Sequence, residues 1–350
     1  MKQAGHFLRA LTRLLVLMLC LSTSGCYYLQ AAAGQWQVIK KREPIETVIR
    51  DTSTPAQLVE RLTLVQQARA FSVDELALPD NKSYRSYADI ERDYVVWNVF
   101  AAPEFSLEPR RWCFPIAGCV SYRGYFSRQA AYDESERLAR KGFDVMVGGV
   151  SAYSTLGNFD DPVLSSMLRW DDLQLVAVLF HELAHQVLYV KGDTGFNESF
   201  ATAVEEFGMQ RWLSSRGQHD DIAAYRERRE LRQDLMALVA SARDDLRTVY
   251  AAADSDEDKR RRKRARLEQL ARVASARLEQ SGRDPARWLR GELNNARLAS
   301  MALYEGHLPA FRALLADCDE DLRCFYAQAG DLAKLKKPAR DAALAALAGG

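Results

Sequence analysis

The stretch from Leu173 to Val190 constrains the fold of this chain more than any other. Its residues are apolar nearly all round a helical projection, which is typical of a helix buried inside a domain. Three polar side chains, His181, Glu182 and His185, nevertheless lie at its centre, so the segment is too polar to cross a bilayer. Unpaired polar groups in an apolar interior cost several kcal/mol, and a bound metal ion would remove that cost.

Both ends of this segment carry helix boundary signals. Asp171 and Asp172 precede it, and carboxylates favour a helix N-terminus. Lys191 and Gly192 follow it, and we expect them to close the helix as a terminal cation and a C-cap.

The central residues form an H-E-x-x-H motif. His181 and His185 lie one helical turn apart, so both imidazoles can reach one ion while Glu182 lies beside them as a candidate base. The chain contains only 5 histidines, so a chance pair at this spacing around a Glu is improbable. The motif therefore favours a zinc hydrolase over an accidental pattern.

A catalytic zinc ion takes three protein ligands and keeps one open position. A second amphipathic helix is expected to begin near Asn197, because apolar residues follow at helical spacing, namely Phe200, Val204 and Phe207. Glu198, in its first turn, is the expected third ligand, and Glu205, two turns along the same face, is the reserve.

The two blocks His181-Glu182-Leu-Ala-His185 and Asn197-Glu198-Ser-Phe-Ala together resemble the gluzincin metallopeptidases. The second block is similar to the Asn-Glu-Gly-Phe-Ala block of zinc aminopeptidases, although the gap between the blocks is shorter here. The resemblance implies that His181, His185 and Glu198 bind one Zn²⁺ ion and that Glu182 is the general base. It also implies a peptide substrate.

A group of bacterial aminopeptidases, predicted from sequence and with lipoprotein-like N-termini, is a closer match. Their pattern extends through residues 27–35, 113–125 and 148–157, so the resemblance spans most of the chain. The aminopeptidase label rests on this resemblance. An endopeptidase of the same fold stays an alternative, as does an envelope scaffold protein without enzymatic activity, although a structural zinc site needs four ligands and only three are found.

The N-terminus indicates export. Cationic residues precede a short apolar run from Leu14 to Leu21, and small residues then lead to Cys26. Residues 1–25 are therefore expected to be a signal peptide, too short to span a membrane stably. Ser-Gly before Cys26 resembles the bacterial lipoprotein processing site, which implies a lipid anchor in the cell envelope, facing the periplasm and attached to the outer membrane. An ordinary cleaved signal with an incidental Cys26 is the alternative.

Four further cysteines fall into two close pairs. Cys113 with Cys119, and Cys318 with Cys324, are expected to form local disulfides, as an oxidising compartment would allow. A zinc site made of all four is the weaker alternative, because neither pair has C-x-x-C spacing.

The order of the predicted elements favours an α+β fold in one catalytic domain, residues 26–350. Helices are expected from about 30 to 70, broken at Pro44 and Pro55, followed by a small mixed sheet within about 80–160. Everything in 162–350 reads as a helical bundle. A gluzincin-like arrangement would place the zinc at the junction of sheet and bundle.

Gly148 and Gly149 lie in a β-prone run just before the motif helix. With Ala152 they are expected to form an exposed edge strand that binds an extended peptide, although a plain connecting turn fits the residues equally well. Tyr153 and Tyr304 are candidate donors to the oxyanion of the reaction, against the alternative that both are packing residues.

An aminopeptidase also needs a carboxylate for the substrate's ammonium group. Asp160, Asp161 and Glu205 are the candidates, and the sequence does not choose among them.

A basic run from Lys259 to Arg266 raises the question of nucleic acid or lipid binding. Acidic residues precede it, the net charge of the chain is only +1, and helical periodicity continues beyond it. A solvated helix face is therefore expected rather than a nucleic-acid site, with contact to an anionic membrane as a minor alternative.

Overall fold

The computed structural model describes residues 27–349, apart from 115–117, 156–158, 290 and 303–305. Cys26 and Tyr304, to which the sequence analysis assigned roles, lie outside the described residues. Among the described helices, none is long and apolar enough to cross a membrane.

The N-terminal part is helical, with breaks at the expected prolines. A helix at 27–40 runs into β1 (Arg42–Pro44), and α2 (Ile45–Arg50) and α3 (Ala56–Asp74) follow. Pro44 and Pro55 are the N-cap residues of α2 and α3. A proline disfavours helical backbone in the residue before it, so each one separates two helical segments.

The β-structure is divided among three small sheets instead of the expected single sheet. The first contains β1, β2 (Ser86–Ala88) and β8 (Val163–Leu164), and it is mixed because β2 pairs antiparallel with β1 and parallel with β8. The expectation that everything after residue 162 is helical is therefore wrong for β8. Its two residues form a strand only because the distant β2 offers them an edge.

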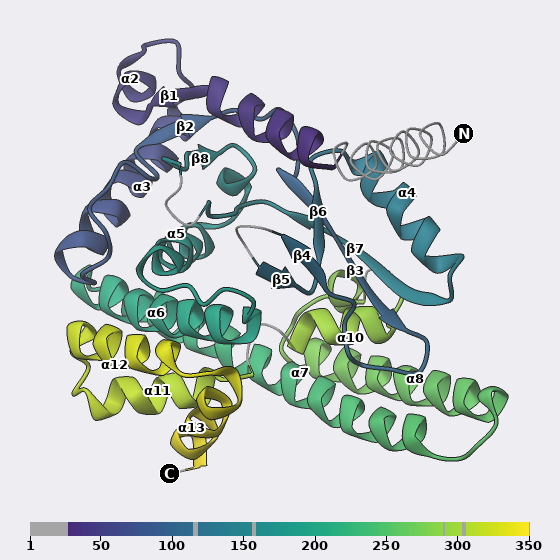
Figure 1. Cartoon of the computed structure of the whole chain (residues 1–350). Coiled ribbons are helices and arrows are strands. Elements are labelled where there is room, and N and C mark those ends of the chain that lie inside the picture. Colours follow the sequence, from purple (N-terminus) through teal and green to yellow (C-terminus); the bar gives the residue numbers. More distant parts are fainter. Residues whose placement is uncertain (1–26, 115–117, 156–158, 290, 303–305, 350) are drawn as a thin grey trace, which may run out of the picture.

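The second sheet has the order β6-β3-β7, with both pairings antiparallel. Its strands are β3 (Val96–Pro103), β6 (Arg123–Tyr125) and β7 (Phe143–Val150), and α4 (Arg128–Ala139) packs against it (Figure 1). Within the described residues no strand pairs with the outer edge of β7. Gly148 and Gly149 therefore lie in a strand at the edge of its sheet, as predicted.

Both predicted disulfides are present. Cys113 and Cys119 face each other across the hairpin of β4 (Trp112–Phe114) and β5 (Gly118–Val120) and are bonded. Cys318 follows α11 (Leu308–Asp317) and is bonded to Cys324 in α12 (Leu322–Lys334).

The remaining chain is a helical bundle, as expected for an α+β protein of this element order. It contains η1 (Met167–Arg169), α5 (Asp172–Val187), α6 (Thr194–Ser215), α7 (His219–Ala251), α8 (Asp256–Gln280), α9 (Pro285–Trp288), α10 (Asn295–Ala302) and, after α12, α13 (Lys337–Gly349). Helices α5 and α6 lie side by side at the centre, while α7 and α8 form a long hairpin at one side (Figure 1). The main core joins these central helices to α3 and α11 through fully buried rings, among them Phe180, Phe200 and Phe311.

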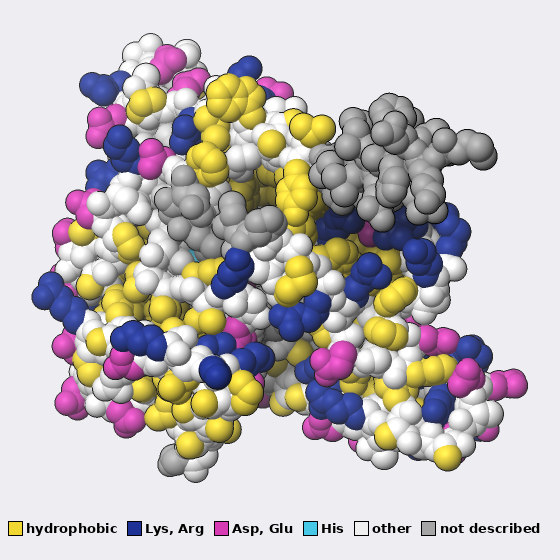
Figure 2. All heavy atoms as spheres, viewed as in Figure 1, with side chains coloured by type: hydrophobic (Ala, Val, Ile, Leu, Met, Phe, Trp, Pro, Cys, Tyr) yellow, Lys and Arg dark blue, Asp and Glu magenta, His cyan; other side chains and the backbone are white. Residues whose placement is uncertain are grey.

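The basic run of 259–266 lies in α8, so the predicted helix is confirmed. Its cations form ion pairs, with Arg260 contacting Glu104, Lys263 contacting Asp144, and Arg266 contacting Asp245. Figure 2 shows acidic and basic side chains intermixed over this hairpin. The run therefore attaches the hairpin to β-structure and neighbouring helix, which is a structural use of these charges.

Candidate metal centre

Helix α5 begins where the sequence indicated and ends earlier. Asp171 is its N-cap, and the Asp171 carboxylate accepts a hydrogen bond of 2.8 Å from the backbone N–H of Gln174. The helix ends at Val187 instead of continuing to Val190, so Gly192 is not its C-cap. The helix ends there because Asn197 of the next helix binds the backbone of Val190. The Asn197 side chain accepts a hydrogen bond from the N–H of Val190 at 2.7 Å and donates one to its carbonyl at 2.9 Å.

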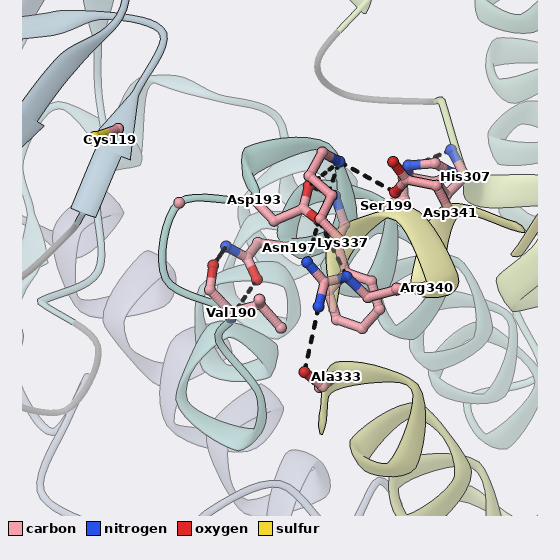
Figure 3. Close-up of polar contacts among 12 residues, drawn as sticks. Cys119, Val190, Asp193, Asn197, Ser199, His307, Ala333, Lys337, Arg340 and Asp341 are labelled. Carbon is pink, nitrogen blue, oxygen red and sulfur yellow. Dashed lines mark hydrogen bonds and ion pairs between the residues drawn. The ribbon is translucent and has the colours of Figure 1, made fainter. Parts of the chain in front are cut away.

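Helix α6 begins at Thr194, earlier than the expected start near Asn197. Its N-cap, Asp193, is only 4% exposed and accepts hydrogen bonds from Arg340 and Lys337 of α13 (Figure 3). The closest Arg340 contact is 2.6 Å. The C-terminal helix thus fixes the start of α6, one turn before Glu198.

Helices α5 and α6 bring the predicted ligands together. Potential ligand atoms of His181, His185 and Glu198 all lie within 4.8 Å of one another, so this group could hold a metal ion. Nε2 of His181 is 3.3 Å from one Glu198 carboxylate oxygen, and Nε2 of His185 is 3.8 Å from the other. The His181 and Glu198 side chains keep 14% and 16% of their surface exposed, so the group is reachable from solvent.

Glu205, the reserve ligand, lies behind the group instead of in it. Its carboxylate is 3.1 Å from Nδ1 of His181 and 3.5 Å from the hydroxyl of Tyr225, which donates to it from α7. When His181 is neutral and donates from Nδ1 to Glu205, its Nε2 lone pair lies on the side of Glu198. A carboxylate behind a histidine is the common way to fix the tautomer and orientation of a metal-binding imidazole.

Burial and the charges within this group shift the pKa values of its members. Burial acts to lower the pKa of His181, but hydrogen bonds to Glu198 and Glu205 outweigh it and raise that pKa to about 10. Burial lowers the pKa of His185 to about 4, and burial raises the pKa of Glu182 to about 7. Without a metal ion, His181 is therefore a cation held between two carboxylates.

The residues fit a divalent cation of zinc type. They offer two imidazole nitrogens and one carboxylate oxygen, a donor set that zinc enzymes use. The low pKa keeps His185 neutral, so it retains a lone pair for a metal. Its Nε2 atom lies toward Glu198, whereas its Nδ1 atom is buried without a hydrogen-bond partner among the described residues.

A buried tyrosine that the sequence analysis missed lies near the group. Tyr84 is 1% exposed, has a backbone φ of 61°, and its hydroxyl has no hydrogen-bond partner among the described residues. Burial and the charges of Glu182 and Asp161 raise its pKa well above the usual value. A non-glycine residue in the left-handed region is uncommon and costs about 1 kcal/mol or more, so surrounding contacts must hold it there.

The three candidate carboxylates for a substrate ammonium differ in position. Asp160 is exposed, while Glu205 is committed to His181. Asp161 is 2% exposed and interacts electrostatically with Glu182. Burial raises its pKa to about 6, and the backbone N–H of Thr155 donates to it at 2.8 Å.

The predicted substrate residues lie upstream of α5. Gly148 and Gly149 belong to β7, opposite Asn98 and Trp97, while Ala152 is buried just beyond that strand. The hydroxyl of Tyr153 donates to Gln35 of the helix at 27–40, so it already has a partner within the protein.

Comparison with known proteins places the chain. A family model described as "putative aminopeptidase" matches residues 26–344. The chain belongs to this family. Membership implies a peptidase acting on peptide substrates. No curated protein and no solved structure matches the chain.

Replacing Glu205 by Gln is expected to weaken metal binding roughly 10–100-fold, because such outer carboxylates contribute about that much to metal affinity. Competition with a chelator of known affinity measures the change. Glu206→Gln is the matched control, since Glu206 is the next residue of α6 but pairs with Arg229 and Arg312. Equal metal affinity in Glu205→Gln and the native protein would contradict the assigned role.

Asp161 is expected to make stability fall with rising pH. Its pKa is about 6 in the folded protein, against about 3.9 in an unfolded chain, so below pH 4 it has no effect and between pH 4 and 6 ionisation favours unfolding. The free energy of unfolding of Asp161→Asn relative to native protein should therefore rise by up to about 3 kcal/mol from pH 4 to 7.

Urea unfolding of the metal-free proteins across this pH range measures that difference. Asp160→Asn, at the exposed neighbouring position, is the control and should show no trend. A flat difference for Asp161→Asn would show that its carboxyl is not protonated preferentially in the fold.

Proposed function

We propose that this protein is a zinc-dependent aminopeptidase. The observation that carries the proposal is the assembly of His181, His185 and Glu198 into one potential metal group, in a member of an aminopeptidase family. Glu182 lies between the two histidines on α5 and supplies a carboxylate that the ligand set does not use.

A bound zinc ion would polarise the scissile carbonyl and make water more acidic. Glu182 takes the proton of the attacking water and delivers it to the amine that leaves, so the residue is regenerated in each turnover. Glu205 would hold a neutral His181 in the tautomer that leaves the Nε2 lone pair available to a metal ion.

The edge of β7 that pairs with no strand among the described residues supports a strand-pairing mode of substrate binding. An extended peptide that adds to this edge would gain main-chain hydrogen bonds to β7. Main-chain pairing of this kind would hold the substrate without requiring a particular substrate side chain at each position.

Gly148→Val tests this mode and is expected to raise KM roughly tenfold, about 1.4 kcal/mol, by crowding the bound strand. A Cβ atom at Gly148 meets only the flexible end of Met146, at 3.3 Å. Gly149 is unsuitable, because a Cβ there would lie 2.4 Å from the Tyr94 ring. Metal content should stay unchanged. An unchanged KM would remove β7 from the substrate site.

Exopeptidase activity has its own test. Cleavage of a peptide is compared with cleavage of the same peptide after N-acetylation. An aminopeptidase should cleave only the peptide with a free ammonium group. Equal cleavage of both would show an endopeptidase.

We further propose that Cys26 is acylated and anchors the protein in the cell envelope, facing the periplasm at the outer membrane. The apolar run before Cys26, the start of the family match at Cys26, and two disulfides suited to an oxidising compartment support this. Labelling with radioactive palmitate should mark the native protein and leave Cys26→Ser unlabelled. Absence of label in the native protein would refute the anchor.

A further inference from the structure

The helix at 27–40 exposes its apolar residues. Tyr28, Leu29 and Trp36 are 46%, 70% and 57% exposed. Ala32 and Ala33, which are also exposed, lie between them in the sequence. At 100° per residue, all five residues fall within an arc of about 140° around the helix axis. We call these five residues the N-terminal stripe, and Figure 2 shows hydrophobic side chains gathered along this part of the molecule, at the top of the view.

The opposite face of the same helix is fixed to the protein. Val38 is 1% exposed, and a Cβ atom at Gly34 would lie 2.1 Å from the ring of Phe126. The side chain of Gln30 accepts a hydrogen bond from the Phe126 N–H at 3.1 Å. The helix therefore cannot rotate to bury the stripe.

Isolated exposed apolar residues are ordinary, but a continuous apolar face on one fixed helix marks a contact surface. The residue types indicate the partner. Tyr and Trp favour the boundary between lipid and water, because each has an apolar ring and a polar edge. Lys40, exposed at the end of the stripe with its Nζ 5.4 Å from the Trp36 ring, is suited to anionic headgroups.

The position of the stripe in the sequence indicates how the helix would lie on a bilayer. Tyr28 is two residues after Cys26, so acyl chains on Cys26 would enter the bilayer at the start of this helix. Residues 27–40 span about 21 Å at 1.5 Å per residue. A helix lying flat beside the anchor would place the whole stripe at the depth of the headgroup boundary.

We propose that the N-terminal stripe docks on the phospholipid bilayer and fixes the orientation of the catalytic domain beside its lipid anchor. The proposal rests on the proposed acylation of Cys26 and is independent of peptidase activity. A single anchored residue would leave the domain free to swing, whereas a second contact along the helix restricts it. A second copy of the chain is a poorer occupant, since stable protein interfaces use about 20–30 residues a side.

Quenching of tryptophan fluorescence by brominated lipids tests the proposal. The mature lipidated protein is reconstituted in phosphatidylethanolamine and phosphatidylglycerol vesicles, with or without bromine on the acyl chains. Brominated vesicles should quench part of the emission of the 6 tryptophans, and Trp36→Phe should lose that part. Trp170→Phe, a partly buried tryptophan before α5, is the matched control and should keep it.

Equal quenching of the native protein and Trp36→Phe would overturn the proposal. So would a doubled mass in sedimentation that Leu29→Gln with Trp36→Gln abolishes, because the stripe would then join two copies. The palmitate experiment separates failure of the anchor from failure of the docking surface. Peptide cleavage in detergent should be the same for all these variants, so loss of the proposed activity gives a different pattern.

Discussion

Glu182→Gln is expected to lower kcat roughly 1,000-fold while leaving the metal content unchanged. The amide is nearly the same size as the carboxylate but cannot accept the proton of the attacking water, and general base catalysis contributes about 10²–10⁴-fold. Glu182 is absent from the group of potential ligands formed by His181, His185 and Glu198, so its loss leaves the metal donors in place. Steady-state kinetics together with metal analysis of the same preparation measures both effects.

Asp172→Asn provides the matched control. Asp172 is in the first turn of α5, contacts Arg61, and lies more than two helical turns before the histidines. Its replacement should leave kcat unchanged. Full activity of Glu182→Gln would show that another group moves the proton, and loss of metal from it would show that Glu182 is a ligand.

Glu198→Gln is expected to weaken metal binding by roughly 100–1,000-fold. Structural zinc sites with four ligands are worth about 10–16 kcal/mol, so removing one charged ligand of three should cost about 3–4 kcal/mol. Activity should fall in parallel and return when excess metal is added. Equilibrium competition with a fluorescent zinc chelator gives the affinity directly.

Comparing the variants of the two α6 carboxylates distinguishes the metal ligand from its outer partner. Glu198 faces Nε2 of His181 and Glu205 faces Nδ1, so their variants should differ. The Glu198 variant should lose more affinity than Glu205→Gln. The reverse order would mean that Glu205 is the ligand and Glu198 the outer partner.

Much of the site could be predicted from local sequence. The spacing of His181 and His185 sets both on one face of α5, and the Asn197-Glu198 block supplies a third donor from the neighbouring helix. Both disulfides could be predicted because each closes a short loop. These features depend on residues close in the chain, where helix geometry and loop length decide the outcome.

Features that depend on distant partners could not be predicted. Helix α6 begins early because Arg340 of α13 holds Asp193, and β8 exists because β2 lies beside it. The pairing of Glu205 with His181 and Tyr225 required the packing of α5, α6 and α7. Nothing in the local sequence around Tyr84 indicates a buried tyrosine close to Glu182.

Anomalous X-ray scattering at the zinc edge tests the central claim most directly. A crystal of the protein purified with zinc should show one strong peak at about 2.0–2.2 Å from Nε2 of His181, a ring nitrogen of His185 and a carboxylate oxygen of Glu198. Glu205 should contact Nδ1 of His181 and not the ion. A peak bound by other residues, or no peak between α5 and α6 in protein that cleaves peptides, would contradict the account.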